Sequence, residues 1–363
     1  MTAVSTEEKP RICLLYTGGT IGMIADEYGV LRPPKEASDF LKIAPELPDL
    51  ADIEFEELMN KDSTNMVPAD WTHIANAIYE RRNEGYNGFV IAHGTDTMHF
   101  TSSALAFAFG SKLKFPVVLT GAQTIPAIYY GDARINLLRA VRVASENLAE
   151  VVISFGDYVF RGCRTQKKDE RKFDAFESPA YYPIADITEK ILFHPNARRK
   201  KDAEEGDLDL QADFADGIVQ VGLIPGLEPA LLEPLINGGK RCRGIVLQSF
   251  GAGNVPNGGD RPEERKYAFG DFIQSAVGKG IPIVITSQFP ANSTLETKYA
   301  PGVAAVEAGA IATGNMTSAA ATVKFRWVLA QVEREIRQGM TMERDRLSRV
   351  KWMMHHRYIL EMD

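Results

Sequence analysis

The stretch CLLYTGGTIG, residues 13–22, joins an apolar run to a polar, glycine-rich segment. The apolar half predicts a buried strand, and the polar half predicts a tight loop at the carboxyl end of that strand. In open α/β sheets, this edge is where ligands bind. Gly18 and Gly19 allow the backbone to approach a small ligand, and Thr17 and Thr20 bring hydroxyl groups. Taken alone, the stretch is also explained by a strand and a turn in which Thr20 caps the next element.

A second stretch repeats this arrangement further along the chain. The run GFVIA, residues 88–92, predicts another buried strand, and it ends in the polar segment HGTDT, residues 93–97. Apolar runs at 115–119 and 151–155 predict two further strands. The sequence therefore places at least two threonine-bearing loops at the ends of buried strands.

Helical patterns separate these strands. Apolar residues recur at helical spacing over residues 70–78, where Asp70 is a plausible N-cap, and helices are also expected at 101–109 and 135–145. Strands that alternate with helices indicate a parallel sheet with crossover connections. The fold class is therefore α/β.

The length of 363 residues favours two domains. Between 195 and 216 the chain becomes charged and poor in apolar residues, so we place the domain boundary there, giving domains 1–205 and 206–363. The second half restarts the α/β alternation and ends in two helices. Its predicted strands are 217–221, 244–247 and 281–286, and its predicted helices are 267–279, 317–337 and 341–356.

Charge and hydropathy exclude two classes of partner. The formal net charge of -7 argues against a nucleic-acid binder, which normally presents a basic face. The basic run at 198–201 is followed at once by acidic residues and is interpreted as a solvated connector. No window approaches the roughly 18 apolar residues that a membrane helix needs.

The cysteines and the N-terminus predict a cytoplasmic protein. Cys13, Cys163 and Cys242 are odd in number and lack metal-ligand spacing, which fits reduced thiols. Residues 1–10 contain no apolar segment and predict no signal peptide.

Common nucleotide-binding and hydrolase motifs are absent from the sequence. It contains no GxxxxGK[ST], no GxSxG and no HExxH, so no metal or cofactor is expected. His93 is interpreted as a structural residue at a strand end, and His355 and His356 as a surface pair.

The order of the remaining motifs resembles the L-asparaginase/glutaminase family, and specifically the type I asparaginases of bacteria and archaea. The matching motifs extend from Thr17 to about Gln331 and are, in order, TGGTIG, HGTDTM, LTGAQ, RGCRTQK, FDAFESP and GAGN. The resemblance implies a larger N-terminal catalytic domain with a mostly parallel sheet, and a smaller C-terminal α/β domain. It also implies an amidohydrolase that acts on L-asparagine through an acyl-threonine intermediate.

The resemblance implies four catalytic residues, Thr20, Thr95, Asp96 and Lys167. Thr20 matches the nucleophilic threonine of the first motif, and the other three match the threonine–aspartate–lysine triad. Counting back from the FDAF motif favours Lys167 over Lys168 within the predicted loop or hairpin. The chemistry is consistent, because a lysine drawn toward a buried threonine can lose its proton by desolvation while an aspartate orients it.

Substrate-binding roles are implied in the same way. Asp96 would pair with the substrate ammonium, and Ser63 and Thr64 would take its carboxylate. The amide N–H groups of Thr95 and Ala122, at strand-end turns, would form an oxyanion hole. Ser63 is also explained as an ordinary turn former.

Asn254 matches a position that, in the family, reaches the substrate from a neighbouring subunit. A homodimer or homotetramer is therefore expected, with asparagine as substrate and glutamine or D-asparagine as alternatives. The other interpretation of Asn254 is a left-handed turn residue.

The sequence departs from the family pattern at two positions. Val30 stands where a loop tyrosine is usual, and Asn65 stands where an aspartate is common. Tyr28, two residues before Val30, is a candidate to replace the missing tyrosine. An altered loop also leaves open a catalytically quiet amino-acid-binding or regulatory protein.

A third alternative is the related amidotransferase subunit that releases ammonia for glutamyl-tRNA amidation. That subunit carries an additional N-terminal domain, for which the residues before Thr17 leave no room.

Overall fold

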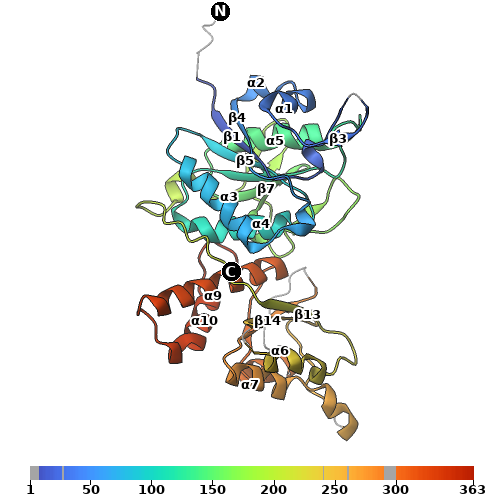
Figure 1. Ribbon diagram of the computed structural model, residues 1–363, viewed down its shortest axis with the longest axis vertical. Helices are drawn as coiled ribbons and strands as arrows, with labels where there is room; N and C mark the ends of the chain where they lie inside the picture. Colours follow the sequence, from blue (N-terminus) through green and yellow to red (C-terminus); the bar gives the residue numbers. More distant parts are fainter. Residues whose placement is uncertain (1–7, 27, 240, 260, 290–299) are drawn as a thin grey trace, which may run out of the picture. The chain divides into compact units, whose positions relative to one another are not determined.

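The computed structural model describes residues 8–26, 28–239, 241–259, 261–289 and 300–363 (Figure 1). The chain forms two compact units. The first contains the residues up to Ser178 together with Tyr182–Leu210, and the second contains Pro179–Tyr181 and Gln211–Asp363. The division predicted from composition, at 205/206, falls in the same charged stretch.

The first unit is built on a mostly parallel sheet, as predicted, and this sheet has eight strands. The strand order is β12-β11-β8-β7-β6-β5-β1-β4. The parallel strands are β1 (Arg11–Tyr16), β4 (Asp52–Glu57), β5 (Gly88–Ala92), β6 (Val117–Thr120) and β7 (Val151–Phe155). The antiparallel strands are β8 (Tyr158–Arg161), β11 (Ala185–Ile187) and β12 (Ile191–Phe193).

Helices cover both faces of this sheet, as Figure 1 shows. Alternate residues of β1, including Leu14 and Tyr16, share one core cluster with the helices on one face. These helices are α1 (Ala37–Ile43), α2 (Leu47–Leu50) and α5 (Ala133–Ala144). The other face carries α3 (Pro68–Arg81) and α4 (Met98–Phe109). Because both faces are covered, the central strands are buried along their length, which explains their continuous apolar runs.

The start of α3 corrects one prediction. Val67 is the N-cap and Pro68 the first helical residue, so Asp70 lies in the third helical position and is not the cap. Its carboxylate accepts the Val67 backbone N–H at 2.7 Å, which is the acidic half of a capping box. Proline is favoured at the first helical position because a backbone N–H there would have no partner within the helix, so its absence in proline costs no hydrogen bond.

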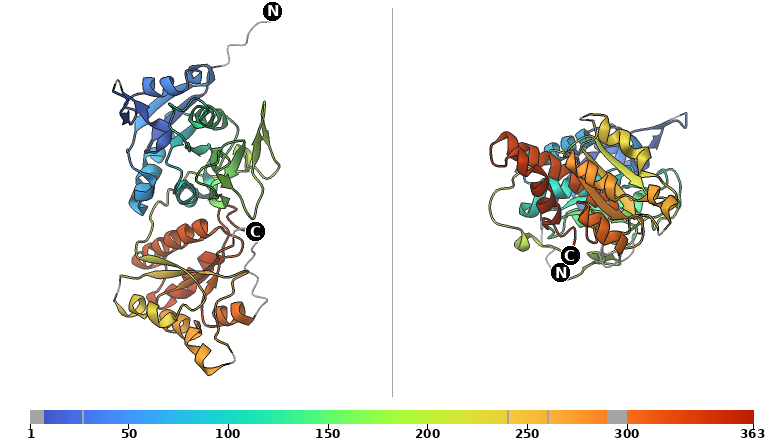
Figure 2. Two further views of the ribbon diagram at one scale, coloured as in Figure 1. Left: turned by 90° about the vertical axis from the view of Figure 1, so that its right-hand side faces the viewer. Right: turned by 90° about the horizontal axis from the view of Figure 1, so that it is seen from below.

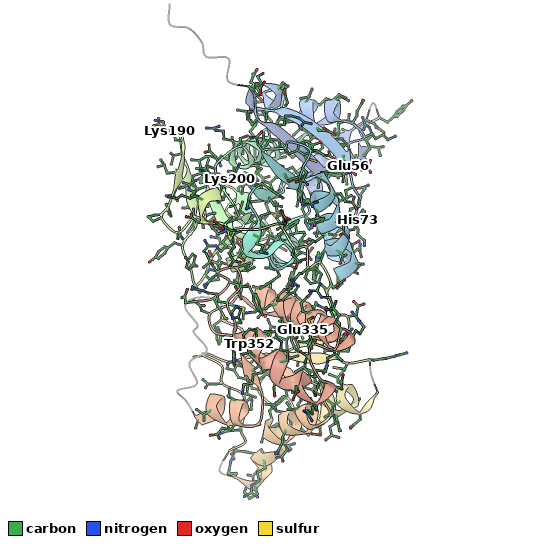
Figure 3. The ribbon with its side chains drawn as sticks, turned by 90° about the vertical axis from the view of Figure 1, so that its left-hand side faces the viewer. Glu56, His73, Lys190, Lys200, Glu335 and Trp352 are labelled. Atoms are coloured by element: carbon green, nitrogen blue, oxygen red, sulfur yellow. The ribbon has the colours of Figure 1, made fainter. Side chains whose placement is uncertain are left out.

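The second unit is an α/β unit, also as predicted, with a four-stranded parallel sheet and helices (Figure 2). Its strands, in order, are β13 (Ile218–Gly222), β14 (Gly244–Ser249), β15 (Ile283–Ser287) and β16 (Ile311–Ala312). Its helices are α6 (Glu233–Asn237), α7 (Gly270–Gly278), α8 (Ala300–Glu307), α9 (Ser318–Arg337) and α10 (Arg346–His355). Arg349 of α10 donates to Glu335 of α9 at 2.7 and 2.8 Å and also lies over the ring of Trp352. Figure 3 labels Glu335 and Trp352 on these two helices.

Two small hairpins complete the first unit. β2 (Ile24–Ala25) pairs with β3 (Leu31–Arg32), and β9 (Gln166–Lys167) pairs with β10 (Phe176–Glu177). The second hairpin confirms the loop or hairpin predicted for this polar segment.

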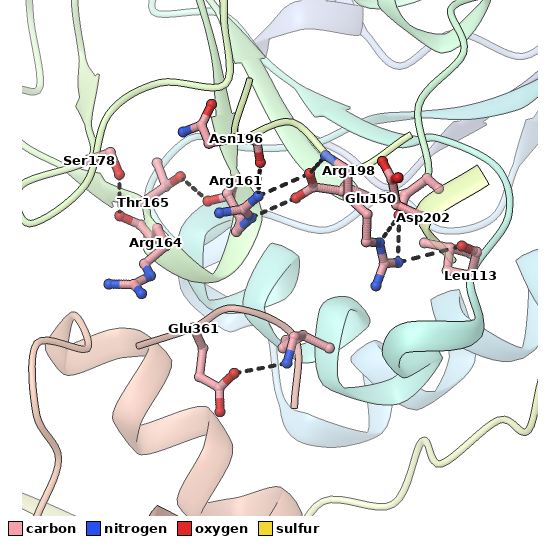
Figure 4. Close-up of polar contacts among 12 residues, drawn as sticks. Leu113, Glu150, Arg161, Arg164, Thr165, Ser178, Asn196, Arg198, Asp202 and Glu361 are labelled. Atoms are coloured by element: carbon pink, nitrogen blue, oxygen red, sulfur yellow. Dashed lines mark hydrogen bonds and ion pairs between the residues drawn. The ribbon is translucent and has the colours of Figure 1, made fainter. Parts of the chain in front are cut away.

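The basic run at 198–201 is not simply a solvated connector. The Arg198 guanidinium donates to the Ala149 carbonyl, and its backbone N–H donates to the buried carboxylate of Glu150. Glu150 also binds Arg161, at 2.6 Å, and Arg161 donates to the Asn196 carbonyl (Figure 4). The prediction was wrong for Arg198, because backbone carbonyls accept from its guanidinium and the Glu150 carboxylate accepts its N–H inside the unit. Lys200 and Lys201 are exposed, as a solvated connector would be.

Candidate active site

The register of the sheet brings the sequence motifs to one edge. Tyr16 lies opposite Ala92, and Ala92 lies opposite Thr120, so β1, β5 and β6 end side by side. The segments that follow these strands therefore start at the same edge, where open α/β sheets bind ligands.

Glycines let these loops touch. A β-carbon at Gly19 would lie 2.5 Å from the Gly94 backbone nitrogen, and one at Gly94 would lie 2.6 Å from Ser63 Oγ. A β-carbon at Gly121 would lie 2.5 Å from the His93 carbonyl oxygen. These approaches are too close for any other residue. The loops that carry Thr20, Ser63 and Ala122 consequently each touch the loop that carries Thr95.

Lys167 is the cation of the site. Its Nζ donates to Thr95 Oγ1 at 2.8 Å and to Asp96 Oδ1 at 2.6 Å. Its side chain is 13% exposed, whereas that of Asp96 is 55% exposed. Lys168 instead binds Asp174, at 2.7 Å. Neighbouring residues at a strand end point to opposite sides, so only one lysine of the pair can reach Thr95.

The Thr95 hydroxyl has a second partner that the sequence did not single out. It donates to Gln123 Oε1 at 3.2 Å, and Gln123 Nε2 donates to the carbonyls of Asp169 and Lys172, each at 3.2 Å. The sequence marks Gln123 as a candidate site residue only by its position, because it ends the LTGAQ motif directly after Ala122.

Thr20 begins a short 3₁₀ turn, Thr20–Gly22. The preceding Gly18 and Gly19 have φ values of 117° and 91°, which favour glycine. Ile21, on the other side, is fully buried in the core. Thr20 is thus held between a glycine that touches the Thr95 loop and an anchored apolar residue.

Ser63 and Thr64 differ in their surroundings. Ser63 is 4% exposed, lies against Gly94 and accepts the Thr97 hydroxyl at its carbonyl, 2.7 Å away. Thr64 is exposed, and both its backbone N–H and its hydroxyl donate to Asp62, each at 2.9 Å. These two hydrogen bonds lower the pKa of the Asp62 carboxyl. The structure therefore brings Ser63 to the Thr95 loop. The Thr64 hydroxyl instead points to Asp62, the N-cap of the short 3₁₀ turn Ser63–Asn65.

The Asp132 carboxylate fixes the turn that contains Ala122 by accepting two of its backbone N–H groups. The Asp132 carboxylate accepts the backbone N–H of Gln123 at 2.9 Å and that of Thr124 at 3.1 Å. Asn136 donates to the Gly121 carbonyl at 3.0 Å and to the same carboxylate. The backbone of residues 121–124 is thereby held in one conformation.

Two further predicted residues belong to other elements of the chain. Asn254 belongs to the second unit, where its N–H donates to the Phe250 carbonyl at 2.8 Å and closes the turn after β14. Tyr28 lies in the turn of the β2–β3 hairpin with 83% of its side chain exposed, and Val30 is 61% exposed. The Asp26 carboxylate accepts the backbone N–H groups of both and shapes this turn.

His93 is buried behind the site. Its Nδ1 lies 2.6 Å from the Gly94 carbonyl and its Nε2 lies 3.0 Å from the Thr101 hydroxyl. A carbonyl can only accept, so Nδ1 carries the proton and Nε2 accepts from Thr101. Burial lowers the pKa of His93 to about 4, so the ring is neutral at pH 7. These contacts agree with the structural role predicted for His93.

Metal binding and membrane insertion gain no support from the described part of the chain. Among the residues that the structure describes, no group of three or more His, Cys, Asp or Glu side chains is placed to hold a metal ion. Within the same described ranges, the helices are all too short or too polar to cross a membrane.

Family models and known proteins match nearly the whole chain. Residues 11–199 match the model described as "Asparaginase, N-terminal", and residues 218–340 match "Glutaminase/Asparaginase C-terminal domain". L-asparaginase 1 of Escherichia coli K12 is 35% identical over 332 residues, which cover 89% of this chain and 93% of that protein.

Two further matches carry different functional names, one an amidotransferase subunit and the other an L-asparaginase. One subunit of the glutamyl-tRNA(Gln) amidotransferase of Methanosphaera stadtmanae is 32% identical over 341 residues, which cover 90% of this chain and 74% of that protein. The solved structure of the thermostable L-asparaginase from Thermococcus kodakarensis has a TM-score of 0.85 and 30% identity. It covers 97% of this chain and 99% of its own.

Proposed function

The chain belongs to the asparaginase family, and we propose that it converts L-asparagine and water to L-aspartate and ammonia. The observation that carries the proposal is the contact of Lys167 Nζ with both Thr95 Oγ1 and Asp96 Oδ1. When substrate covers the site, burial disfavours the charged form of a lysine. The neutral amine is then a base 2.8 Å from a hydroxyl. Such assistance is typically worth about 10²–10⁴ in rate.

Thr20 is the proposed nucleophile. Its oxygen attacks the side-chain amide carbonyl of the substrate while its proton passes to the Thr95–Lys167 pair. The backbone N–H groups of Thr95 and Ala122 stabilise the oxyanion, and one such donor is typically worth about 2.7–4 kcal/mol. The carbon–nitrogen bond then breaks, and the leaving nitrogen takes a proton and departs as ammonia. Water hydrolyses the acyl-threonine ester, which restores Thr20 and releases L-aspartate.

Asp96 links substrate binding to the state of Lys167. Its carboxylate favours the ammonium form of Lys167, which opposes catalysis. Because the Asp96 side chain is 55% exposed, it can also meet the ammonium of the substrate. That pairing weakens its hold on Lys167 when substrate is bound. Ser63, with Thr64 after a turn of its hydroxyl, takes the substrate carboxylate.

The proposal includes a cytoplasmic homo-oligomer, either a dimer or a tetramer. Asn254 lies in the second unit and would complete the site of a neighbouring subunit. Activity would then depend on assembly.

The test is the release of ammonia by the purified full chain from L-asparagine, L-glutamine and D-asparagine. We expect the highest kcat/KM for L-asparagine, and ammonia release at least about 10³-fold slower in a folded Thr95→Ala variant. A wild-type chain that releases no ammonia from these amides would instead be an amino-acid-binding or regulatory protein.

A second candidate is the ammonia-releasing subunit of a glutamyl-tRNA amidotransferase. It is favoured by the 32% identity to the amidotransferase relative of Methanosphaera stadtmanae, of which this chain covers 74%. That function predicts ammonia release from glutamine that rises when a partner subunit and charged tRNA are added. Rapid turnover of L-asparagine by the isolated chain argues against it.

A further inference from the structure

A chain of hydrogen bonds passes through the Thr95 hydroxyl to Gln123. An ammonium can only donate, so Thr95 Oγ1 accepts from Lys167 Nζ, 2.8 Å away. The single hydroxyl proton of Thr95 is then directed to Gln123 Oε1, 3.2 Å away. Lys167 and Gln123 together define both the accepting and the donating side of this hydroxyl.

The orientation of the Gln123 amide is decided by its other partners. Its Nε2 lies 3.2 Å from the carbonyl oxygens of Asp169 and Lys172, which can only accept. The nitrogen must therefore face these carbonyls and the oxygen must face Thr95. The amide cannot flip without losing all three hydrogen bonds.

The backbone of Gln123 is fixed as firmly as its side chain. Its N–H donates to the carboxylate of Asp132, which is 4% exposed. The residues that Gln123 grips, Asp169 and Lys172, form a turn in which the Asp169 carboxylate accepts the Lys172 N–H at 3.0 Å. This turn begins two residues after Lys167. Gln123 thus connects the end of β6 to the segment that carries the catalytic lysine.

We propose that Gln123 is a positioning residue for the reaction, an inference that rests on the proposed function. It holds Thr95 Oγ1 2.8 Å from Lys167 Nζ while the lysine is an ammonium. Once the lysine is neutral, rotation about the Cβ–Oγ1 bond turns the Thr95 proton from Gln123 to the amine without moving the oxygen. Gln123 also fixes the turn after Lys167. Without Gln123, the Thr95 oxygen and the turn after Lys167 are held less firmly, and only a fraction of molecules are arranged for proton transfer at any moment. The expected loss is in kcat, because Gln123 acts on Thr95 and not on the substrate.

The test compares Gln123→Met with Gln166→Met. Methionine keeps the length of glutamine and removes its donor and acceptor. Gln166 is the matched control, because it adjoins Lys167 but donates to Glu177, at 3.2 Å. We expect kcat for ammonia release to fall about tenfold in Gln123→Met, equivalent to roughly 1.4 kcal/mol. KM should change less than about twofold, and Gln166→Met should match the wild type.

A second variant separates positioning from a role in stability. Gln123→Glu keeps an acceptor for Thr95, loses the donor to the two carbonyls and adds a negative charge near Lys167. A negative charge added inside the site favours the protonated forms of the groups around it, so the acidic limb of the kcat–pH profile should move to higher pH. A role in stability alone would lower the melting temperature and leave the profile in place.

Three outcomes would overturn the proposal. The first is a folded Gln123→Met enzyme with the same kcat as Gln166→Met. The second is a Gln123→Glu enzyme with an unshifted kcat–pH profile. The Gln123→Glu measurement alone decides the question if Gln123→Met does not fold. In both cases an active wild type leaves the proposed function standing. A wild type that releases no ammonia refutes the proposed function, and this inference with it.

Discussion

Lys167 Nζ lies 2.8 Å from Thr95 Oγ1, although the two residues are 72 positions apart in the chain. Thr95 follows a buried strand of the central sheet, whereas Lys167 ends a two-residue strand of a separate hairpin. The contact therefore depends on the packing of two different elements. A hydroxyl held against a partly buried lysine that also binds a carboxylate is an arrangement suited to proton transfer.

The two threonines should both be essential to turnover. We expect Thr20→Ala and Thr95→Ala each to lower kcat by at least about 10³, because a nucleophile and its activator act as a unit. The measurement is ammonia release from L-asparagine by variants with wild-type circular dichroism. Thr72→Ala is the control, since the Thr72 hydroxyl bonds the Pro68 carbonyl within α3. Near-normal turnover in either folded variant would refute the assignment.

Tyr28 should contribute to turnover only if the β2–β3 hairpin closes over bound substrate. The side chain is 83% exposed, so its hydroxyl must move to act in the site. We expect Tyr28→Phe to lower kcat at least about tenfold, roughly 1.4 kcal/mol of barrier, and Val30→Ala to have little effect. Steady-state kinetics on L-asparagine measure both. If kcat of Tyr28→Phe is unchanged, the residue has no part in closure.

Asp39 anchors the base of the same hairpin. Its carboxylate accepts from Arg32 at 3.2 Å, Lys42 at 2.7 Å and the Lys35 backbone at 2.8 Å. Burial alone would raise the pKa of Asp39, but these hydrogen bonds outweigh it and hold that pKa well below its usual range. We expect Asp39→Asn to lower the free energy of unfolding at pH 7 by about 1.5–3 kcal/mol.

The pH dependence of that loss has a defined sign. A carboxyl whose pKa is lower in the folded state stabilises the protein above its unfolded pKa, about 3.9, and less as pH falls below it. The difference between wild type and Asp39→Asn should therefore shrink between pH 5 and pH 3 in urea denaturation. Asp49→Asn, at an exposed position of α2, is the control. An equal difference at both pH values would contradict the account.

The buried strands and the loops that follow them could be predicted from sequence, because central parallel strands are apolar throughout. β4 escaped prediction for the opposite reason. Its sequence DIEFEE lies at the edge of the sheet and alternates acidic with apolar residues. Acidic residues are depleted in strands, so the pattern gives a weak signal.

The contacts of the site could be predicted only where a motif names the residue. The choice between Lys167 and Lys168 depends on the β9–β10 pairing, which no local pattern reveals. Gln123 donates to the backbone carbonyls of Asp169 and Lys172, which are 46 and 49 positions further along the chain. A sequence carries no signal for a backbone carbonyl that accepts a side-chain hydrogen bond. The same holds for Arg198, whose charge suggested solvent but whose partner is the Ala149 carbonyl.

The most direct test of the account is the rate of ammonia release from L-asparagine by Lys167→Met and Lys168→Met, measured side by side with the wild type. Methionine keeps the apolar stem of lysine and removes the proton acceptor. Lys167→Met should lose roughly 10²–10⁴ of kcat with little change in substrate binding. Lys168→Met should retain wild-type turnover, because Lys168 pairs with Asp174 away from Thr95. A folded Lys167→Met enzyme with wild-type turnover, or a loss confined to Lys168→Met, would contradict the account.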